Sequence, residues 1–248
     1  MRYARSPGDL PERCDGCNQP FSIGHALQCK KGVLVIARHN EIRDELCDLA
    51  SKAILPSAVR DEPKIYNSRT TEMKPTTAEG QNKDVKRNLN KSRGEERGDV
   101  LIRGLWARGT DCIIDVRVTD TDSKSCRSKD PMKALADQEK EKKKKYLQPC
   151  LEQRRHFTPF VISVDGLIGK EGQTLLKRLS ALLAKKWEKP YSEVCGYVNA
   201  RMSIAIVRAT HMCLRGSRIP TSHMSNRRPQ PMGRPGRSEP ISTLDSST

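Results

Sequence analysis

Two acidic residues, Asp99 and Asp115, lie at the start of one apolar segment and inside another. Asp99 precedes the run VLIRGLWA, and Asp115 lies within CIIDVRV. These runs predict two strands joined by a hairpin at residues 108–110. Carboxylates that converge on adjacent strands can hold one or two Mg²⁺ or Mn²⁺ ions beside a scissile phosphate, because such ions prefer oxygen ligands. The pattern therefore predicts a metal-dependent nuclease site.

Each of these aspartates also has a simpler explanation. Asp99 follows Gly98 and could serve only the geometry of a turn. Asp115 lies between Ile114 and Val116 on an apolar strand, where a carboxylate must face solvent, pair with a cation or bind a metal. Only the metal site requires both carboxyl groups to lie close together on one side of the sheet.

The composition favours a polyanionic partner. The 248 residues carry 46 Lys and Arg against 30 Asp and Glu, a formal net charge of +16. Such a charge favours nucleic acid through counterion release, with DNA as the expected partner and RNA as an alternative. A ribosomal or tail-like basic chain is the other explanation. Hydrophobic content of 35% and aromatic content of 4% are low, so one modest core is expected.

The sequence contains no apolar run of eighteen residues and no apolar segment after its first residues. We therefore expect no membrane association and no secretory signal, which predicts an intracellular protein. A reducing compartment makes thiols or metal ligands the expected state of the nine cysteines. The basic cluster at 140–145 and the need to reach DNA suggest the nucleus.

Four metal-binding residue types cluster near the N-terminus with the spacing Cys14-x2-Cys17-x7-His25-x3-Cys29. A tight Cys-x-x-Cys turn supplies two thiolates, and a short helical segment can place His25 and Cys29 on one face. Free cysteines beside an incidental histidine are the alternative. Because four ligands close a tetrahedral shell, the spacing predicts a structural Zn²⁺ in a zinc finger at residues 13–30, after a leader at 1–12.

The remaining elements follow from periodicity and breakers. Residues 38–54 have the apolar spacing of an amphipathic helix, and its first turn holds His39 and Glu41, which could serve either as charges at a helix end or as site groups. Further predicted elements are a strand at 59–65, a strand at 160–166 and packing helices at 171–189 and 191–216. A helix is also predicted from Pro131, with Leu135, Tyr146, Leu147, Cys150 and Leu151 as its buried positions. The predicted organisation is a first helix and strand at 36–65, a disordered insertion at 66–97, the rest of the domain at 98–215 and a disordered basic tail at 216–248.

The fold class expected from this order is α/β (α+β), with a small mixed sheet. The series helix, strand, insertion, strand, strand, helix, strand resembles the core of the PD-(D/E)xK nucleases. The fragments CDGC, FSIGHALQCKKG, RHNEIRD, EP, RGD, LWARGTDCIIDVRV, EKEKKKKY, FTPFVIS and RMSIAIVRATHMCLRG together resemble the zinc-finger and restriction-enzyme-like endonuclease region downstream of the reverse transcriptase in retrotransposon-derived proteins. The likeness covers residues 14 to 218 except the polar insertion.

This resemblance implies an endonuclease that nicks target DNA so that a polymerase can prime from the break. It implies that Asp99 and Asp115 are metal ligands and that Glu41 or Glu62 is a supporting acid. It also implies a reverse transcriptase in the same or a neighbouring polypeptide, since this chain has no aromatic-x-Asp-Asp polymerase segment.

The sequence departs from the D-x-K pattern at Arg117, whose guanidinium can clamp a phosphate but cannot accept a proton at accessible pH. In the resembling retroelement nucleases the following helix usually supplies the lysine, which makes Lys142 and Lys143, followed by Tyr146, the candidates here. Lys142 and Tyr146 are four residues apart and share a helix face, so Lys142 is expected nearer the sheet than Lys144.

Two further functions remain open from the sequence. The chain could be a catalytically inactive nucleic-acid-binding zinc module left from a transposon, and Arg117 together with the long insertion favours that reading. It could also be a structural zinc-binding interaction protein, although such a protein would not need the positive charge.

Overall fold

The computed structural model describes residues 10–65, 97–123 and 126–219. Residues through Arg218 form one compact unit, and a second unit begins at Ile219. The helices of the first unit are α1 (Ile23–Gln28), α2 (Leu34–Ala53), the 3-10 turn η1 (Pro56–Ala58), α4 (Pro131–Glu152), α5 (Lys170–Trp187) and α6 (Tyr191–Arg215). Its strands are β1 (Val59–Asp61), β2 (Val100–Arg103), β3 (Asp111–Thr119) and β4 (His156–Ser163). The expected mixed α+β class with a small mixed sheet is confirmed.

The four strands form a sheet in the order β1-β2-β3-β4. The pairs β1–β2 and β2–β3 are antiparallel, and β3 pairs with β4 in parallel through the α4 crossover. β2 ends its ladder with β3 at the pair Val100–Ile114, whereas β3 continues to Thr119. One edge of β3 therefore extends past its antiparallel neighbour.

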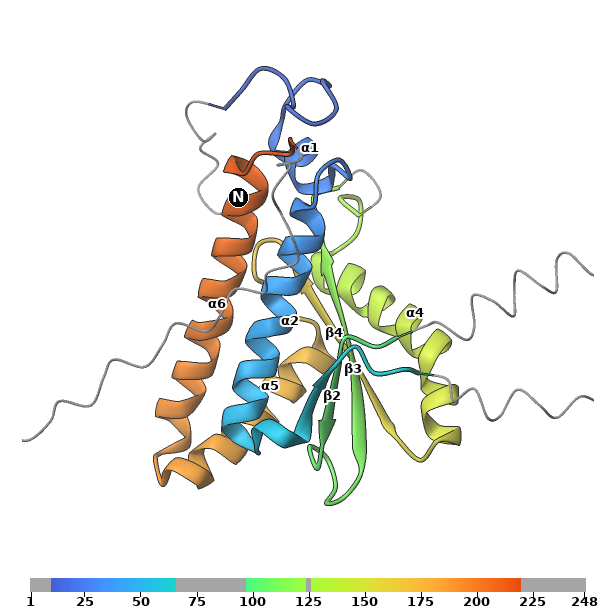
Figure 1. Cartoon of the computed structure of the whole chain (residues 1–248), viewed down its shortest axis with the longest axis vertical. Coiled ribbons are helices and arrows are strands. Elements are labelled where there is room, and N and C mark those ends of the chain that lie inside the picture. The colour runs from blue at the N-terminus through green and yellow to red at the C-terminus, as the bar shows by residue number, and fades with distance from the viewer. Residues whose placement is uncertain (1–9, 66–96, 124–125, 220–248) are drawn as a thin grey trace, which may run out of the picture. The chain divides into compact units, whose positions relative to one another are not determined.

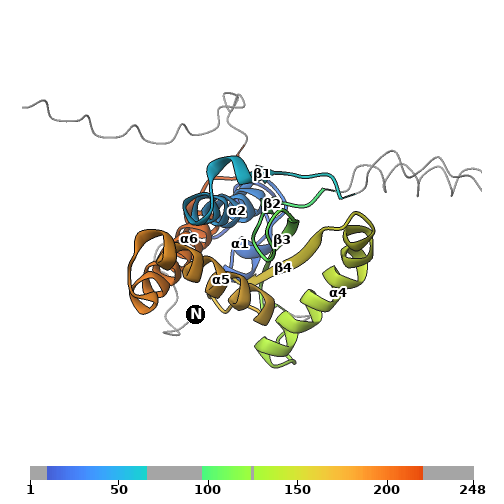
Figure 2. The same ribbon diagram turned by 90° about the horizontal axis from the view of Figure 1, so that it is seen from below.

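The sheet is covered by helices on both faces (Figures 1 and 2), with α2, α5 and α6 on one side and α4 on the other. Successive side chains of β3 point to opposite faces of the sheet. Ile114 and Val116 join the main core with α2, α5 and α6, whereas Ile113 joins a smaller core with Tyr146 and Phe157 beneath α4. The side chain of Asp115 accordingly belongs to the α4 face.

The helices form where apolar periodicity predicts them. The apolar positions expected to face the core are fully or partly buried in α2, α5 and α6, including Leu46, Leu179, Val198 and Met202. In α4, Asp130 caps the first turn by accepting a hydrogen bond from the backbone N–H of Lys133 at 3.0 Å. The helix begins at Pro131 as expected.

Three details differ from the sequence-based expectations. β4 begins at His156 rather than at residue 160, because Pro159 lies in an edge strand, where a missing N–H is tolerated. β1 stops at Asp61 because Glu62 adopts a left-handed conformation with φ of 47°. Leu151, expected in the core, is 52% exposed because the phase set by Tyr146 and Cys150 turns it to solvent.

The predicted tail boundary is also corrected. We expected a disordered tail from residue 216, but Arg218 is 2% exposed and belongs to the folded unit. Residues 1–9 of the predicted leader lie outside the described residues. So do residues 66–96 of the predicted insertion and residues 220–248 of the predicted tail. Among the described residues, no helix has both the length and the apolar character that crossing a bilayer requires.

Gly98 offers a test of the packing that places Asp99. A Cβ atom at Gly98 would lie 2.4 Å from Cγ2 of Ile113, inside the small core beneath α4. Gly98→Ala is therefore expected to lower the free energy of unfolding by about 1–3 kcal/mol, the usual range for overpacking. Urea denaturation measures this loss.

Gly196→Ala is the matched control, because a Cβ at Gly196 in α6 meets nothing within 4 Å. Adding a methyl group inside this helix should raise the free energy of unfolding by about 0.5–1 kcal/mol. Equal stability changes in the two variants would contradict the packing described for Gly98.

Candidate zinc centre and carboxylate site

The N-terminal Cys/His segment folds locally as its spacing requires. The turn after Cys14 closes with a hydrogen bond from Asn18 N–H to the Cys14 carbonyl at 2.8 Å, and Asn18 takes the left-handed conformation that asparagine tolerates. Ser22 caps α1 by accepting a hydrogen bond from His25 N–H. His25 therefore lies in α1, and Cys29 follows at its C-cap.

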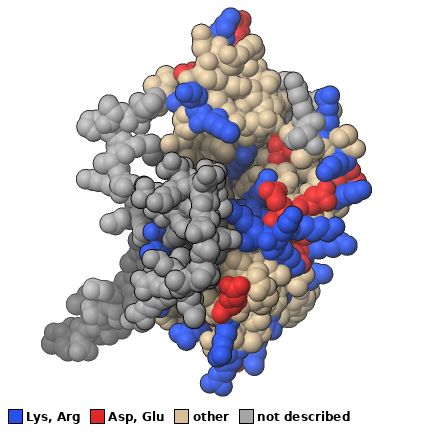
Figure 3. Space-filling model, turned by 90° about the vertical axis from the view of Figure 1, so that its right-hand side faces the viewer, with Lys and Arg blue, Asp and Glu red and all other residues tan. Residues whose placement is uncertain are grey.

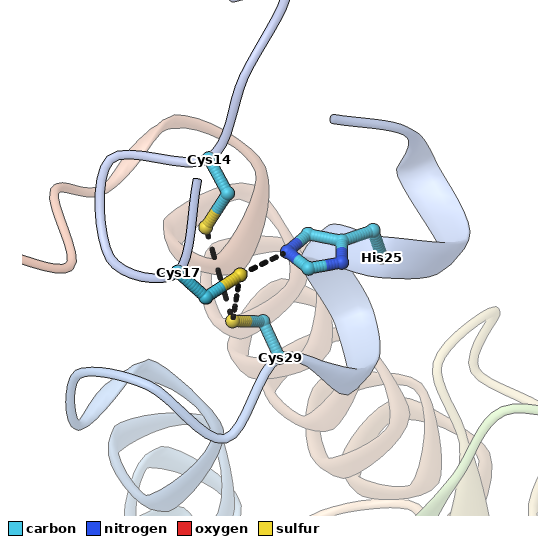
Figure 4. Close-up of side chains that lie close together, drawn as sticks. All are labelled: Cys14, Cys17, His25 and Cys29. Atoms are coloured by element: carbon cyan, nitrogen blue, oxygen red, sulfur yellow. Dashed lines mark hydrogen bonds between the residues drawn. The ribbon is translucent and has the colours of Figure 1, made fainter. Parts of the chain in front are cut away.

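The four side chains point toward one common centre (Figure 4). Sγ of Cys29 lies 3.8 Å from Sγ of Cys14 and 3.9 Å from Sγ of Cys17. Nε2 of His25 lies 3.3 Å from Sγ of Cys17, and all four ligand atoms lie within 4.8 Å of one another. Tetrahedral Zn²⁺ with Zn–S bonds of about 2.3 Å requires S–S distances of about 3.8 Å. The cluster therefore has the size of a zinc shell.

The protonation of the cluster also suits a cation. Burial raises the pKa of Cys14, but hydrogen bonds from His25 and from the backbone N–H groups of Gly16 and Cys17 outweigh it and lower this pKa to about 6. Thiolates are the metal-binding form of cysteine. A closed set of three cysteines and one histidine is compatible with a structural zinc, as the spacing predicted.

The second cluster forms where β3 extends past β2. Asp99 Oδ2 accepts a hydrogen bond from the backbone N–H of Val116 at 2.6 Å. Nε2 of His39, on α2, lies 3.2 Å from the carbonyl oxygen of Val116 and 3.3 Å from Asp99 Oδ2. Because both neighbours accept hydrogen bonds, Nε2 carries the hydrogen. Asp99 and His39 thus bond the backbone N–H and C=O groups of Val116, at the edge of β3 that β2 does not reach.

Asp115 lies under α4 and pairs with a lysine from that helix. Its side chain is 8% exposed, and its Oδ2 lies 2.7 Å from Nζ of Lys142. This close approach is a charge-assisted ion pair, and the charge and hydrogen bond of Lys142 favour the ionised form of Asp115. Lys142 therefore compensates the buried charge of Asp115, and a metal ion at this carboxylate would have to share or displace that contact.

Electrostatic interactions link Asp115 to Lys142, Asp99 and His39. Burial raises the pKa of Asp115; the negative charge of Asp99 raises it further, and Lys142 opposes both. Burial lowers the pKa of His39, but the hydrogen bond to Asp99 and the charge of that carboxylate outweigh burial and raise the pKa above its usual value. A divalent cation beside the two aspartates would favour the ionised form of Asp115.

The basic and aromatic candidates occupy different positions. Lys142 reaches Asp115, as helix spacing predicted, whereas Lys143 pairs with Glu171 at the start of α5. Arg117 forms an ion pair of 3.1 Å with Glu141 on α4, on the same face as Asp115. The ring of Tyr146 packs against Phe157, and Nζ of Lys142 lies 5.6 Å from the ring centroid. Lys142 is thus the one of the two candidate lysines that contacts the carboxylate group.

Neither glutamate expected to support the aspartates points to them. Glu41 lies two residues beyond His39 on α2, about 200° around the helix, and pairs with Arg208 of α6 at 3.3 Å. The backbone N–H of Glu62 donates to the Asp99 carbonyl, but the Glu62 carboxylate faces Arg43 and Arg97 at 3.6 and 3.7 Å. Among the described residues, the carboxylate site is therefore built from Asp99, Asp115, Lys142 and His39.

His39 is the site residue whose role sequence reasoning left open. It stands in a helix whose periodicity indicates only which residues enter the core, and the partners of His39 come from a segment sixty residues later. Its histidine type was the available signal, because imidazole is common at metal and proton-transfer sites.

Comparison of the sequence with family models and with curated proteins found no match to either.

Zinc binding is tested by metal content. The chain should bind one equivalent of Zn²⁺, and Cys17→Ser should reduce this to well below one equivalent because a hydroxyl is a poor zinc ligand. Metal analysis after dialysis measures the stoichiometry. Cys195→Ser, in α6 and outside the cluster, should keep the full equivalent. A full equivalent in both variants would show that the cluster is not the zinc site.

The raised pKa of His39 predicts a pH dependence of stability. A histidine whose folded-state pKa exceeds its unfolded value near 6.5 stabilises the fold fully below that value, and this contribution disappears as pH rises through the folded-state pKa. Wild type should therefore lose stability relative to His39→Gln as pH rises from about 6 to 8.5. Urea denaturation at several pH values without added Mg²⁺ measures it.

His211→Gln is the control for this experiment, because His211 is exposed on α6. Its stability relative to wild type should change much less over the same pH range. A flat difference for His39→Gln would rule out the Asp99–His39 interaction as described.

Proposed function

We propose that the chain is a Mg²⁺-dependent DNA endonuclease module of a retrotransposon-derived reverse transcriptase protein. One observation carries this proposal. The buried carboxylate of Asp115 pairs with Lys142 at 2.7 Å, and the negative charge of Asp99 raises the pKa of Asp115. Two carboxylates on adjoining chain segments with one lysine are the groups that metal-assisted phosphodiester hydrolysis requires.

Each residue has a role in this chemistry. A bound Mg²⁺ would supply charge neutralisation and lower the pKa of a ligated water. Asp99 and Asp115 would hold the ion, and Lys142 would orient the attacking water and stabilise the negative charge on the phosphate in the transition state. Arg117, at the rim of the same face, is positioned to hold a neighbouring phosphate, a function that its fixed charge allows.

The charge of the surface supports a nucleic acid substrate. Lys and Arg side chains gather on the side of the molecule where α4 lies, with acidic side chains between them (Figure 3). Lys140, Lys144 and Lys145 are exposed on α4, the helix that carries Lys142. Cations around a buried site draw the phosphate backbone toward it. DNA as the substrate, with RNA as an alternative, is part of this proposal.

The sequence resemblance extends the proposal to the whole system. The ordered series of fragments resembles an endonuclease region that follows a reverse transcriptase, so the nick would prime a polymerase in the same or a neighbouring polypeptide. Such a reaction takes place where chromosomal DNA is found, which places the proposed activity in the nucleus.

A catalytically inactive, nucleic-acid-binding zinc module is the second candidate. It is favoured by the engagement of Asp99 Oδ2, which already accepts from Val116 N–H and contacts His39. In this alternative Asp99 only completes the edge of β3. Arg117 in the position of a lysine points the same way, because it cannot act as a base.

Plasmid nicking tests the proposed activity. With Mg²⁺ or Mn²⁺, wild type should convert supercoiled plasmid to the open circle, and Asp115→Asn should abolish conversion because it removes a metal ligand. Lys142→Met should slow nicking by about 10²-fold or more, the usual cost of removing one transition-state donor. DNA affinity should stay within a few-fold of wild type in both variants, since the overall charge changes little.

Matched controls come from the outer face of α4. Asp137→Asn removes a carboxylate that pairs only with the exposed Lys129 in the described chain, and Lys140→Met removes an exposed lysine two residues before Lys142. Both variants should nick at nearly wild-type rates. Retained DNA binding with no nicking by wild type would favour the inactive module, and nicking by Asp115→Asn would reject the assigned site.

A further inference from the structure

A buried arginine just after the C-terminal end of α6 contacts the candidate zinc-binding segment, residues 13–30. Arg218 is 2% exposed, and its guanidinium donates to the carbonyl oxygens of Ala26 at 3.0 Å and Cys213 at 2.5 Å. Asp15, inside the Cys14–Cys17 turn, accepts a hydrogen bond from Arg218 N–H at 2.7 Å. Arg218 thus contacts both the Cys14–Cys17 turn and α1.

The packing around Arg218 leaves no space for side chains at two glycines. A Cβ at Gly16, between the first two cysteines, would lie 2.7 Å from Cβ of Arg218. A Cβ at Gly32 would lie 2.8 Å from Cα of Arg218, and Gly32 has a φ of +69°. The guanidinium also stands 5.3 Å from the ring centroid of Phe21. Arg218 is therefore closely packed against Gly16, Gly32 and Phe21.

A second buried arginine, Arg38 on α2, also forms a hydrogen bond with α1. Arg38 is 5% exposed and donates from its guanidinium to the carbonyl oxygen of Leu27 at 2.9 Å. Arg218 bonds Ala26 and Arg38 bonds Leu27, so both guanidinium groups bind carbonyls of the last turn of α1. That helix carries the ligand His25 and leads directly into the ligand Cys29.

Burying two cations is unfavourable unless a negative charge lies nearby. Within the described part of the chain, Nε of Arg38 and Nε of Arg218 have no hydrogen-bond partner, and of the two arginines only Arg218 contacts a carboxylate, that of Asp15 at 3.9 Å. A Zn²⁺ bound by three thiolates and a neutral histidine carries a net charge of −1. An occupied cluster would therefore add negative charge to the segment that both guanidinium groups hold.

We propose that Arg38 and Arg218 are positioning residues of the zinc site, which hold α1 and the Cys14–Cys17 turn so that the four ligands stay converged. Because coupling is reciprocal, zinc binding in turn holds the C-terminal end of α6 against the N-terminal segment. The inference rests on the zinc site and is independent of nuclease activity. It makes the zinc-binding segment an integral part of the folded unit rather than a separately moving finger.

Zinc affinity of the full chain tests this inference. Competition with a chromophoric chelator should show Arg218→Met binding Zn²⁺ about 10–100-fold more weakly than wild type, the usual effect of removing a group that orients metal ligands. Arg38→Met should show a loss in the same direction. Arg208→Met is the matched control, because Arg208 lies on α6 but is exposed and pairs with Glu41. It should retain wild-type affinity.

A merely structural arginine would give a different result. It would lower the melting temperature of zinc-loaded and zinc-free protein equally, whereas a positioning residue should reduce the stabilisation that zinc adds, and raised zinc concentration should recover part of it. Unchanged zinc affinity in Arg218→Met, or no zinc binding by wild type, would overturn the proposal.

Hydrogen exchange of the wild-type protein avoids variants that fail to fold. Removing zinc with a chelator should increase exchange of the amides of residues 213–216 more than that of residues 198–202 in the same helix. Equal exchange at both ends of α6 after zinc removal would also overturn the proposal.

Discussion

The buried carboxylate of Asp115 is the constraint that organises the centre of this fold. An ionised group at 8% exposure needs a compensating charge, and α4 supplies it because the phase that buries Tyr146 and Cys150 also turns Lys142 inward. The crossover from β3 to β4 thus brings a cation from α4 onto the strand before it. The net contribution of such a buried pair to stability is small, because the cost of removing both charges from water offsets their attraction.

The unequal lengths of β2 and β3 create the second half of the site. Because the β2 ladder ends at Val100, the N–H and C=O groups of Val116 have no strand partner, and Asp99 and His39 take that role. In the proposed nuclease, the carboxylate that completes the sheet edge would also be a metal ligand. Metal binding at Asp99 would have to share Oδ2 with a backbone N–H, which links the strength of the sheet edge to the occupancy of the site.

Local patterns predicted the elements, whereas long-range packing decided the site. The cysteine spacing and the α5 and α6 periodicities depend on neighbouring residues, so the sequence predicted them. Whether Glu41 or His39 faces the aspartates depends on how α2 is rotated against a sheet formed by later residues, which its own periodicity does not specify. The position of Arg218 also depends on long-range packing. Its basic, polar sequence context predicted a tail, whereas its partner Asp15 lies 203 residues earlier.

A cleft of about 870 Å³ lies beside the zinc-binding segment, and its charge bears on where the proposed nucleic acid substrate would bind. It opens at the carboxyl ends of β3 and β4, and Asp120, Asp122 and Asp165 line it together with Lys30 and Lys31. Three carboxylates repel a phosphate backbone, and two lysines do not reverse the sign of the lining. The α4 side carries the exposed lysines and the Asp115–Lys142 pair, so DNA that reaches the carboxylates would approach from there, with the zinc-binding segment fixed at the end of α6.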